Sequence, residues 1–308
     1  MGERMRNLGD HEFGGQHTEI KLELVEKYLK TYTSALKNTF NHLWYIDAFA
    51  GSGSRTVRTE ARGGDLLEEP IPEKIENRRG SARIALDVFP HFTRLIFIEQ
   101  NPNYCSVLNE LKNENPHRDI HVVNGNANEV LQTHINKVNW SGCRAVLFLD
   151  PYGMEVEWKT LEAIARTQAI DVWFLFPLSG LYRQAARNLS DIDDVKRRAL
   201  TRMLGTDKWE DELYSKVPPA TDLLGLLTAG DVRQRNADVA GLEQYVKQRL
   251  ETIFPLVSVP FPLPAKEKPQ RFSLFFAASN RSPKALGLAK KFANHILADG
   301  ISSHVLPR

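Results

Sequence analysis

Acidic side chains follow three apolar segments of the chain, each at the point where the segment ends. Asp47 follows the apolar run 43–46, Glu99 follows 95–98, and Asp150 follows 145–149. Short, fully apolar runs are typical of the buried strands of a parallel sheet, whose carboxyl ends meet at one edge. We therefore expect the three carboxylates to gather at one edge of a sheet, where open α/β folds bind their ligands.

A glycine-containing turn follows the first of these segments. It has the sequence Phe49-Ala50-Gly51-Ser52-Gly53. Two glycines two positions apart let the backbone turn tightly and approach a ligand with no side chain between them. The pattern indicates a nucleotide-cofactor site, although the same glycines could also serve only to make a tight turn between a strand and a helix.

The chemistry of these groups matches a cofactor made of a nucleoside and an amino acid. A carboxylate can accept hydrogen bonds from two adjacent ribose hydroxyls, and Glu99 is the candidate for that contact. Asp47 and Asp150 would favour positively charged ammonium and sulfonium groups, and the backbone amides of residues 50–53 could hold a carboxylate. These properties point to S-adenosylmethionine.

A further contact is expected at the end of a third strand. Asn126 follows Gly125 there, next to Ala127, and its side-chain oxygen could accept a hydrogen bond from the adenine amino group. The alternatives are simpler: Gly-Asn is also a common turn, and Glu99 could be a solvated charge at the end of a strand.

The elements that must position these residues alternate between strands and helices. Strands are predicted at 43–46, 94–99, 120–123, 145–150, 170–176 and 272–277, with helices between them and an amphipathic helix at 20–32 before the first. This alternation predicts an α/β fold with a mostly parallel, doubly wound, Rossmann-like sheet. From the helix at 20–32, Lys21 and Thr18 could reach the site, or Lys21 could simply be solvated.

Two segments interrupt this pattern. Residues 54–79 are polar, contain two prolines and several arginines, and are too long for an ordinary connection, so we expect an inserted arm. Residues 179–256 change to polar helical segments, which predicts a helical insertion or lid. The expected organisation is a core over 1–178, the insertion over 179–256, and a C-terminal part over 257–308 that completes the core.

Several motifs together resemble a known family. The glycine turn is similar to the cofactor motif of class I methyltransferases, especially the Phe-x-Gly-x-Gly form of DNA and RNA amino-methyltransferases. In order along the chain, the segments 45–51, 80–81, 97–99, 148–153 and 275–279 resemble the three-Cys-motif partner proteins, TcmP. The resemblance covers roughly residues 18–297. It implies a Rossmann-like, S-adenosylmethionine-dependent methyltransferase and a separate cysteine-motif companion protein.

The segment Asp150-Pro151-Tyr152-Gly153 is similar to the Asp/Asn-Pro-Pro-Tyr/Phe motif of amino-methyltransferases, but it lacks one proline. By this resemblance, Asp150 and the Pro151 carbonyl would accept hydrogen bonds from the acceptor amine, and Tyr152 would stack on a flipped base. The shift of the aromatic residue by one position leaves the stacking geometry open. Asp150 could instead cap the helix that follows.

The sequence thus favours methylation of a nucleobase amine in DNA or RNA. Methylation of a protein or small molecule is the alternative among enzymes, and a non-catalytic module that binds a partner is the alternative from another class. Lysine and arginine clusters such as residues 196–198 could contact phosphates, or could be solvated surface.

Composition sets the outer bounds. The chain has 308 residues, of which 42% are hydrophobic, and a net charge of +2, which neither requires nor excludes a nucleic-acid partner. Its two cysteines, Cys105 and Cys143, indicate neither a disulfide framework nor a thiolate metal site, and the nine histidines show no metal-ligand spacing. With no apolar span long enough for a membrane and no secretory leader, we expect a soluble, cytoplasmic protein without a metal.

Overall fold

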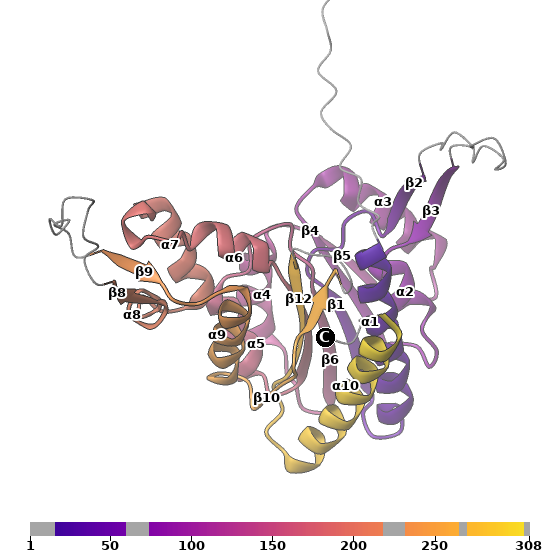
Figure 1. Cartoon of the computed structure of the whole chain (residues 1–308). Helices are drawn as coiled ribbons and strands as arrows, with labels where there is room; N and C mark the ends of the chain where they lie inside the picture. Colours follow the sequence, from indigo (N-terminus) through magenta and orange to yellow (C-terminus); the bar gives the residue numbers. More distant parts are fainter. Residues whose placement is uncertain (1–15, 60–73, 218–231, 265–269, 305–308) are drawn as a thin grey trace, which may run out of the picture.

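A mostly parallel sheet forms the centre of the protein (Figure 1). The computed structural model describes residues 16–59, 74–217, 232–264 and 270–304. The strands of the sheet lie in the order β10-β12-β7-β6-β1-β4-β5, and β11 pairs with β12. Their bounds are β1 His42–Asp47, β4 Arg94–Glu99, β5 Ile120–Asn124, β6 Cys143–Leu149, β7 Ile170–Phe176, β10 Leu256–Val257, β11 Phe261–Leu263 and β12 Phe272–Ala278.

The strand directions define a Rossmann-like topology. Strands β5, β4, β1, β6 and β7 are all parallel, whereas β12 runs antiparallel to β7 and to its other neighbours, β10 and β11. The chain winds outward from β1 through β4 to β5, and then returns to β6 on the other side of β1. The switch point of the sheet, where such folds bind ligands, therefore lies between β1 and β6.

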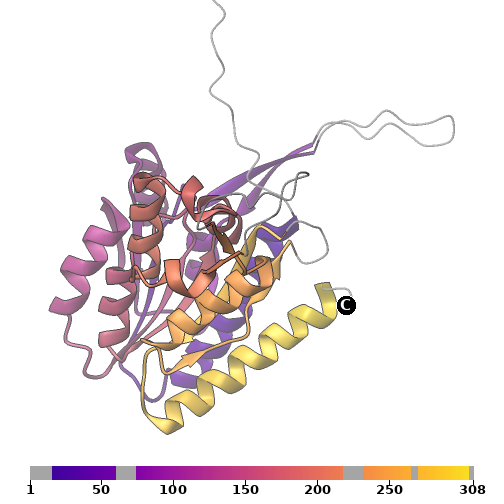
Figure 2. The same cartoon turned by 60° about the vertical axis from the view of Figure 1, so that its left-hand side comes forward.

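Helices cover both faces of the sheet (Figures 1 and 2). One layer contains α1 (Gln16–Leu36), α2 (Ser81–Asp87), α3 (Pro102–Glu114) and α10 (Pro283–His304). The other contains α4 (Ala127–His134), α5 (Trp158–Arg166), α6 (Leu178–Gln184) and α9 (Val239–Glu251). Along β6, Val146 and Phe148 belong to the first core and Leu147 and Leu149 to the second. Burial on both faces explains why this strand is an unbroken apolar run.

The predicted arm begins with β2 (Ser54–Thr59) and returns as β3 (Lys74–Arg79), which pairs antiparallel with β2. The two strands project from the body of the molecule beside α2 (Figure 1). At the base of the arm the Gly80 amide donates to the Gly53 carbonyl (3.0 Å). This bond brings the start of α2 next to the glycine turn, so the arm does not separate the two.

The insertion between β7 and β10 contains α6, α7 (Asp194–Leu204), α8 (Trp209–Leu213), the antiparallel pair β8 (Tyr214–Lys216) and β9 (Arg233–Arg235), and α9. Its buried residues Leu200, Trp209 and Leu242 belong to the same hydrophobic core as the strand residues Leu147 and Phe275. The insertion is therefore packed on the sheet through a continuous core. Figure 1 shows α6, α7, α8 and α9 to the left of the sheet.

The predicted strands 94–99 and 170–176 match β4 and β7 residue for residue. The first helix is longer than predicted, since α1 spans Gln16–Leu36. The sequence did not indicate the strands of the arm, the pair β8 and β9, or the short strands β10 and β11. None of the helices that the structure describes is both long enough and apolar enough to cross a membrane.

Candidate functional site at the carboxyl edge of the sheet

The glycine turn follows directly on β1 and depends on left-handed backbone conformations. Gly51 has φ +58° and Gly53 has φ +71°. A Cβ atom at Gly53 would lie 3.2 Å from Leu108 Cδ2, whereas one at Gly51 would meet no atom within 4 Å. Glycine is thus favoured at position 53 by conformation and by a tight approach of Leu108, while Gly51 has open space beside its α-carbon, where a ligand can approach the backbone.

The backbone amides of the turn are largely used within the protein. The Ala50 amide donates to the Ile98 carbonyl (3.1 Å), the Gly51 amide to Glu99 Oε2 (2.9 Å), and the Gly53 amide to the Ala50 carbonyl (3.2 Å). We expected these amides to hold a ligand carboxylate. Instead, two of the four hold the turn against β4 and a third closes the turn on itself, which fixes its shape but leaves fewer donors for a ligand.

Glu99 links the end of β4 to the glycine turn. Its Oε2 accepts from Gly51 and its Oε1 accepts from the Asn101 amide (2.8 Å), and the residue is 7% exposed. Each carboxylate oxygen can accept more than one hydrogen bond. Glu99 is therefore oriented by the protein and still has acceptor capacity for a pair of hydroxyl groups.

Asp47 lies at the end of β1 and is fully buried. Its Oδ1 accepts from the Phe49 amide (3.3 Å) and its Oδ2 from the Tyr45 hydroxyl (3.3 Å). Burial raises the pKa of Asp47 to about 7; the Ser81 hydrogen bond opposes this rise and the nearby Asp150 charge adds to it. In this structure Asp47 acts as an interior anchor of the turn.

Asn126 and Ala127 lie where β5 leads into α4. Asn126 is the N-cap of that helix, and its side-chain oxygen accepts from the amides of Asn128 (2.9 Å) and Glu129 (3.4 Å). The same oxygen that we expected to meet adenine therefore also stabilises the helix. Ala127 is the first residue of α4 and is 7% exposed.

Asp150, the first residue after β6, is paired with a lysine from a distant part of the chain. Lys21 Nζ forms an ion pair and hydrogen bond with Asp150 Oδ2. The Lys21 side chain is 8% exposed and the Asp150 side chain 25%. Of the two readings of Lys21 that the sequence allowed, the structure supports contact with the site rather than solvation.

Pro151 is buried, and Tyr152 is 60% exposed. The pKa of the Tyr152 phenol is raised to about 12, first by partial desolvation and then by the neighbouring Tyr104, Glu99 and Asp150. The phenol therefore stays protonated at neutral pH and offers an uncharged ring at the rim of the site.

The structure brings the predicted carboxylates to one edge of the sheet. In the strand register Asp47 lies opposite Phe97 on β4 and Phe148 on β6, so Glu99 and Asp150 follow on the two strands that flank β1. Asn126 and Ala127 follow on β5, the next strand out. No three metal-binding side chains come together among the residues with described positions.

The insertion contributes two residues near this edge that the sequence did not single out. A Cβ atom at Gly180 of α6 would lie 3.3 Å from the Met154 side chain, so α6 packs against the loop that carries Tyr152. Tyr182, on the same helix, is 44% exposed, and the Arg235 guanidinium lies 4.2 Å from the centre of its ring. No local sequence pattern links Tyr182 to Arg235, because the two residues are far apart in the chain and meet only in the folded structure.

The fold is a Rossmann-like α/β fold, with the glycine turn after β1 and Glu99 at the end of the adjacent strand β4. No known family profile matches the chain, and no curated protein matches it. Among solved structures, it is similar to protein LPL1258 from Legionella pneumophila (12% identity, 92% of this chain and 94% of that chain, TM-score 0.48). It is also similar to an S-adenosylmethionine-dependent methyltransferase from Clostridium acetobutylicum (8%, 85% and 92%, TM-score 0.36) and to the putative methyltransferase yhhF from Escherichia coli (12%, 69% and 87%, TM-score 0.30). Likenesses this distant assign neither activity nor substrate to this chain.

Proposed function

We propose that the protein is an S-adenosylmethionine-dependent methyltransferase that acts on an amino group of a nucleobase in DNA or RNA. The observation that carries the proposal is the placement of Glu99, the glycine turn and Asp150 at the carboxyl ends of the neighbouring strands β4, β1 and β6. This combination offers acceptors for a ribose, an open approach to the backbone, and a carboxylate beside the place where a methyl group would be transferred.

The proposed cofactor fits the groups that are present. Glu99 is oriented and has acceptor capacity for two ribose hydroxyls, and the space beside Gly51 admits a ligand against the backbone. The adenine would lie near the start of α4, where the Asn126 oxygen would be shared between the helix cap and the adenine amino group. We assign the cofactor site to Phe49, Ala50, Gly51, Ser52, Gly53, Glu99, Asn126 and Ala127, with Asp47 anchoring the turn from the interior.

Bound S-adenosylmethionine would supply an electrophilic methyl group. The acceptor amine would donate hydrogen bonds to Asp150 and to the Pro151 carbonyl, which directs its lone pair toward the methyl group. Because Lys21 donates to Asp150 Oδ2, Oδ1 is the oxygen that would accept the hydrogen bond from the amine. Lys21 would thereby hold Asp150 in position and balance its charge.

The nucleobase is favoured by the aromatic groups at the rim. Tyr152 is well exposed next to Asp150, and an exposed ring can stack on an extruded base. Tyr182 with Arg235 offers a second ring and a cation on the insertion side.

The resemblance to the three-Cys-motif partner proteins extends this proposal to a companion protein that carries the cysteine motif. The insertion would be the docking surface, because it is the largest addition to the sheet. Recovery of such a protein with the purified chain from its native cells would support the pairing.

The direct test uses purified protein and labelled S-adenosylmethionine. Calorimetry should show cofactor binding that Glu99→Ala weakens by at least about tenfold, the loss of a charge-assisted pair of hydrogen bonds. Label should then enter a DNA or RNA fraction, and Asp150→Asn should abolish the transfer while cofactor binding persists.

The outcomes separate the alternatives. Label in a protein or small-molecule fraction alone would replace the nucleobase by another acceptor. Cofactor binding without transfer to any fraction, with or without the companion, would favour a non-catalytic partner-binding module. Turnover by Asp150→Asn at the wild-type rate would show that the assignment of the acceptor site is wrong.

A further inference from the structure

A second concave site lies at the opposite, amino-terminal edge of the sheet. It is a pocket of about 680 Å³, a volume typical of small-molecule sites. Its walls come from the segments that lead into β1, β4, β5 and β6, so it shares no residue with the candidate methyltransferase site. The lining residues are Asn41, His42, Trp44, Thr93, Arg94, Asp119, Val138, Asn139 and Cys143.

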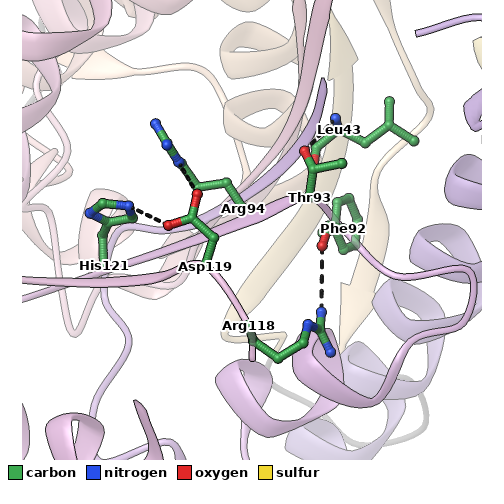
Figure 3. Close-up of polar contacts among 7 residues, drawn as sticks. All are labelled: Leu43, Phe92, Thr93, Arg94, Arg118, Asp119 and His121. Carbon is green, nitrogen blue, oxygen red and sulfur yellow. Dashed lines mark hydrogen bonds and ion pairs between the residues drawn. The ribbon is translucent and has the colours of Figure 1, made fainter. Parts of the chain in front are cut away.

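Arg94 is held in this pocket by contacts with neighbouring side chains (Figure 3). Its Nε donates to Asp119 Oδ2 (2.7 Å), and Asp119 Oδ1 lies 2.7 Å from His121 Nε2. Its guanidinium carbon lies 4.8 Å from the centre of the Trp44 ring, and Trp44 in turn packs on Trp140 (5.6 Å between ring centroids). A guanidinium fixed in this way loses little conformational entropy when it binds a ligand.

The two terminal nitrogens of Arg94 are not used by the protein, as far as the described residues show. The side chain makes its hydrogen bond through Nε alone and is 37% exposed. The nearby Arg118 is different, because it donates to the carbonyls of Leu86 (2.8 Å) and Phe92 (3.5 Å), the second of which Figure 3 shows. Arg118 is therefore part of the scaffold, whereas Arg94 presents a planar pair of donors to the pocket.

The rest of the lining suits an organic ring rather than a bare anion. Trp44, Val138 and Cys143 give apolar contact, and His42, Asn41 and Asn139 add polar groups. The Asn139 oxygen accepts from the Ser141 amide (3.0 Å), which leaves its amide nitrogen for a ligand. Burial raises the pKa of the Cys143 thiol to about 11, so it stays protonated and contributes contact rather than nucleophilic chemistry.

We propose that this pocket binds a nucleoside monophosphate, with the phosphate on the free nitrogens of Arg94 and the base against Trp44, Val138 and the asparagine amides. Paired guanidinium donors match the oxygens of a phosphate, and the apolar wall and amide groups match the face and edge of a base. The site is independent of the proposed methyl transfer, since it lies at the other end of the strands.

The test is calorimetry on the full chain with UMP and GMP, in the presence of saturating S-adenosylhomocysteine so that the carboxyl-edge site is not measured. Arg94→Met, which keeps the length of the side chain and removes its donors, should weaken binding by about tenfold or more. Arg94→Lys, which keeps the charge but not the planar fork, should give an intermediate loss. Arg166→Met, at an exposed position at the end of α5, is the matched control and should bind as wild type does.

Uridine and inorganic phosphate, each lacking one half of the ligand, should bind at least about tenfold more weakly than UMP. Circular dichroism of each variant shows whether it is folded. The proposal is overturned if neither nucleotide binds, if folded Arg94→Met and Arg94→Lys both bind as tightly as wild type, or if inorganic phosphate binds as well as UMP. Failure of methyl transfer would not affect this result.

Discussion

The ion pair between Lys21 and Asp150 gives the sharpest test of how the site is built. It joins α1 to the end of β6 across 129 positions of sequence. Lys21→Met preserves most of the side-chain volume and stem but removes the charge, and Asp150→Asn is the matched change on the other side. If the pair is formed as the structure has it, the two changes must be coupled energetically.

The expected magnitude follows from burial. Loss of one partner of a fully buried pair costs about 3–5 kcal/mol, because the other charge is left uncompensated. The Lys21 side chain is 8% exposed but that of Asp150 is 25% exposed, so water can partly solvate the remaining carboxylate. We therefore expect Lys21→Met to lower the free energy of unfolding by about 2 kcal/mol. The double variant should be less destabilised than the sum of the single variants by about 1–3 kcal/mol.

The assay is urea denaturation of the wild type, both single variants and the double variant, followed by circular dichroism. Lys27→Met is a suitable control, since Lys27 is on the same helix and pairs with Glu23 at the surface, where about 0.5 kcal/mol is expected. Additive single-variant losses, or a Lys21→Met loss no larger than that of the control, would refute the reasoning that this pair is a built part of the site.

Three further predictions concern other groups. The folded pKa of Asp47, about 7, lies above its unfolded value of 3.8, so its stabilising contribution is present below pH 4 and is lost as the pH rises through 7. In urea melts at several pH values, Asp47→Asn should remove a decline of up to about 4 kcal/mol in the free energy of unfolding. Asp171, with a pKa of about 6, should keep a smaller decline. Gly205→Ala should lower the free energy of unfolding by about 3–5 kcal/mol, because φ is +70° and the new Cβ would lie 2.0 Å from Trp158. Gly142→Ala is the control, since its φ is +71° but no atom lies within 4 Å of the new Cβ, and thermal melts should show a loss of only about 1–2 kcal/mol. Tyr152→Ala should lower kcat/KM for the nucleic-acid acceptor by about 10- to 100-fold. Because Tyr152 is 60% exposed, the same change should alter the free energy of unfolding by less than about 0.5 kcal/mol. Tyr152→Phe should retain most of the activity, and equal kcat/KM values for wild type and Tyr152→Ala would exclude stacking.

The central sheet could be predicted from the sequence because its strands are buried on both faces. Segments 94–99 and 170–176 are mostly apolar and of strand length, and the structure has them at those bounds. The carboxyl ends of parallel strands must then meet, so the grouping of Glu99 with the glycine turn was predictable as well. Features that follow from hydrophobic patterning can therefore be predicted from the sequence.

The contacts that depend on packing could not be predicted in the same way. β10 has only 2 residues and β11 only 3, and both are strands because β12 offers an edge to pair with. The use of the Gly51 amide by Glu99 depends on how closely β4 and the turn approach, which no local pattern encodes. From the sequence, Lys21 could reach the site or be solvated, and only the position of α1 on the sheet brings it to Asp150.

The positions of the two additions to the sheet indicate which parts of the chain would select the acceptor. The arm leaves the sheet at the carboxyl end of β1, directly after Gly53, and the insertion leaves it at the carboxyl end of β7, with α6 beginning at Leu178. Both therefore start at the edge that carries Glu99 and Asp150, on either side of the switch point between β1 and β6. Elements added at this edge can contact an acceptor without disturbing the sheet, which is how open α/β folds change specificity. Exchange of the insertion should accordingly alter the acceptor while cofactor affinity, which we propose depends on Glu99 and the glycine turn, is retained.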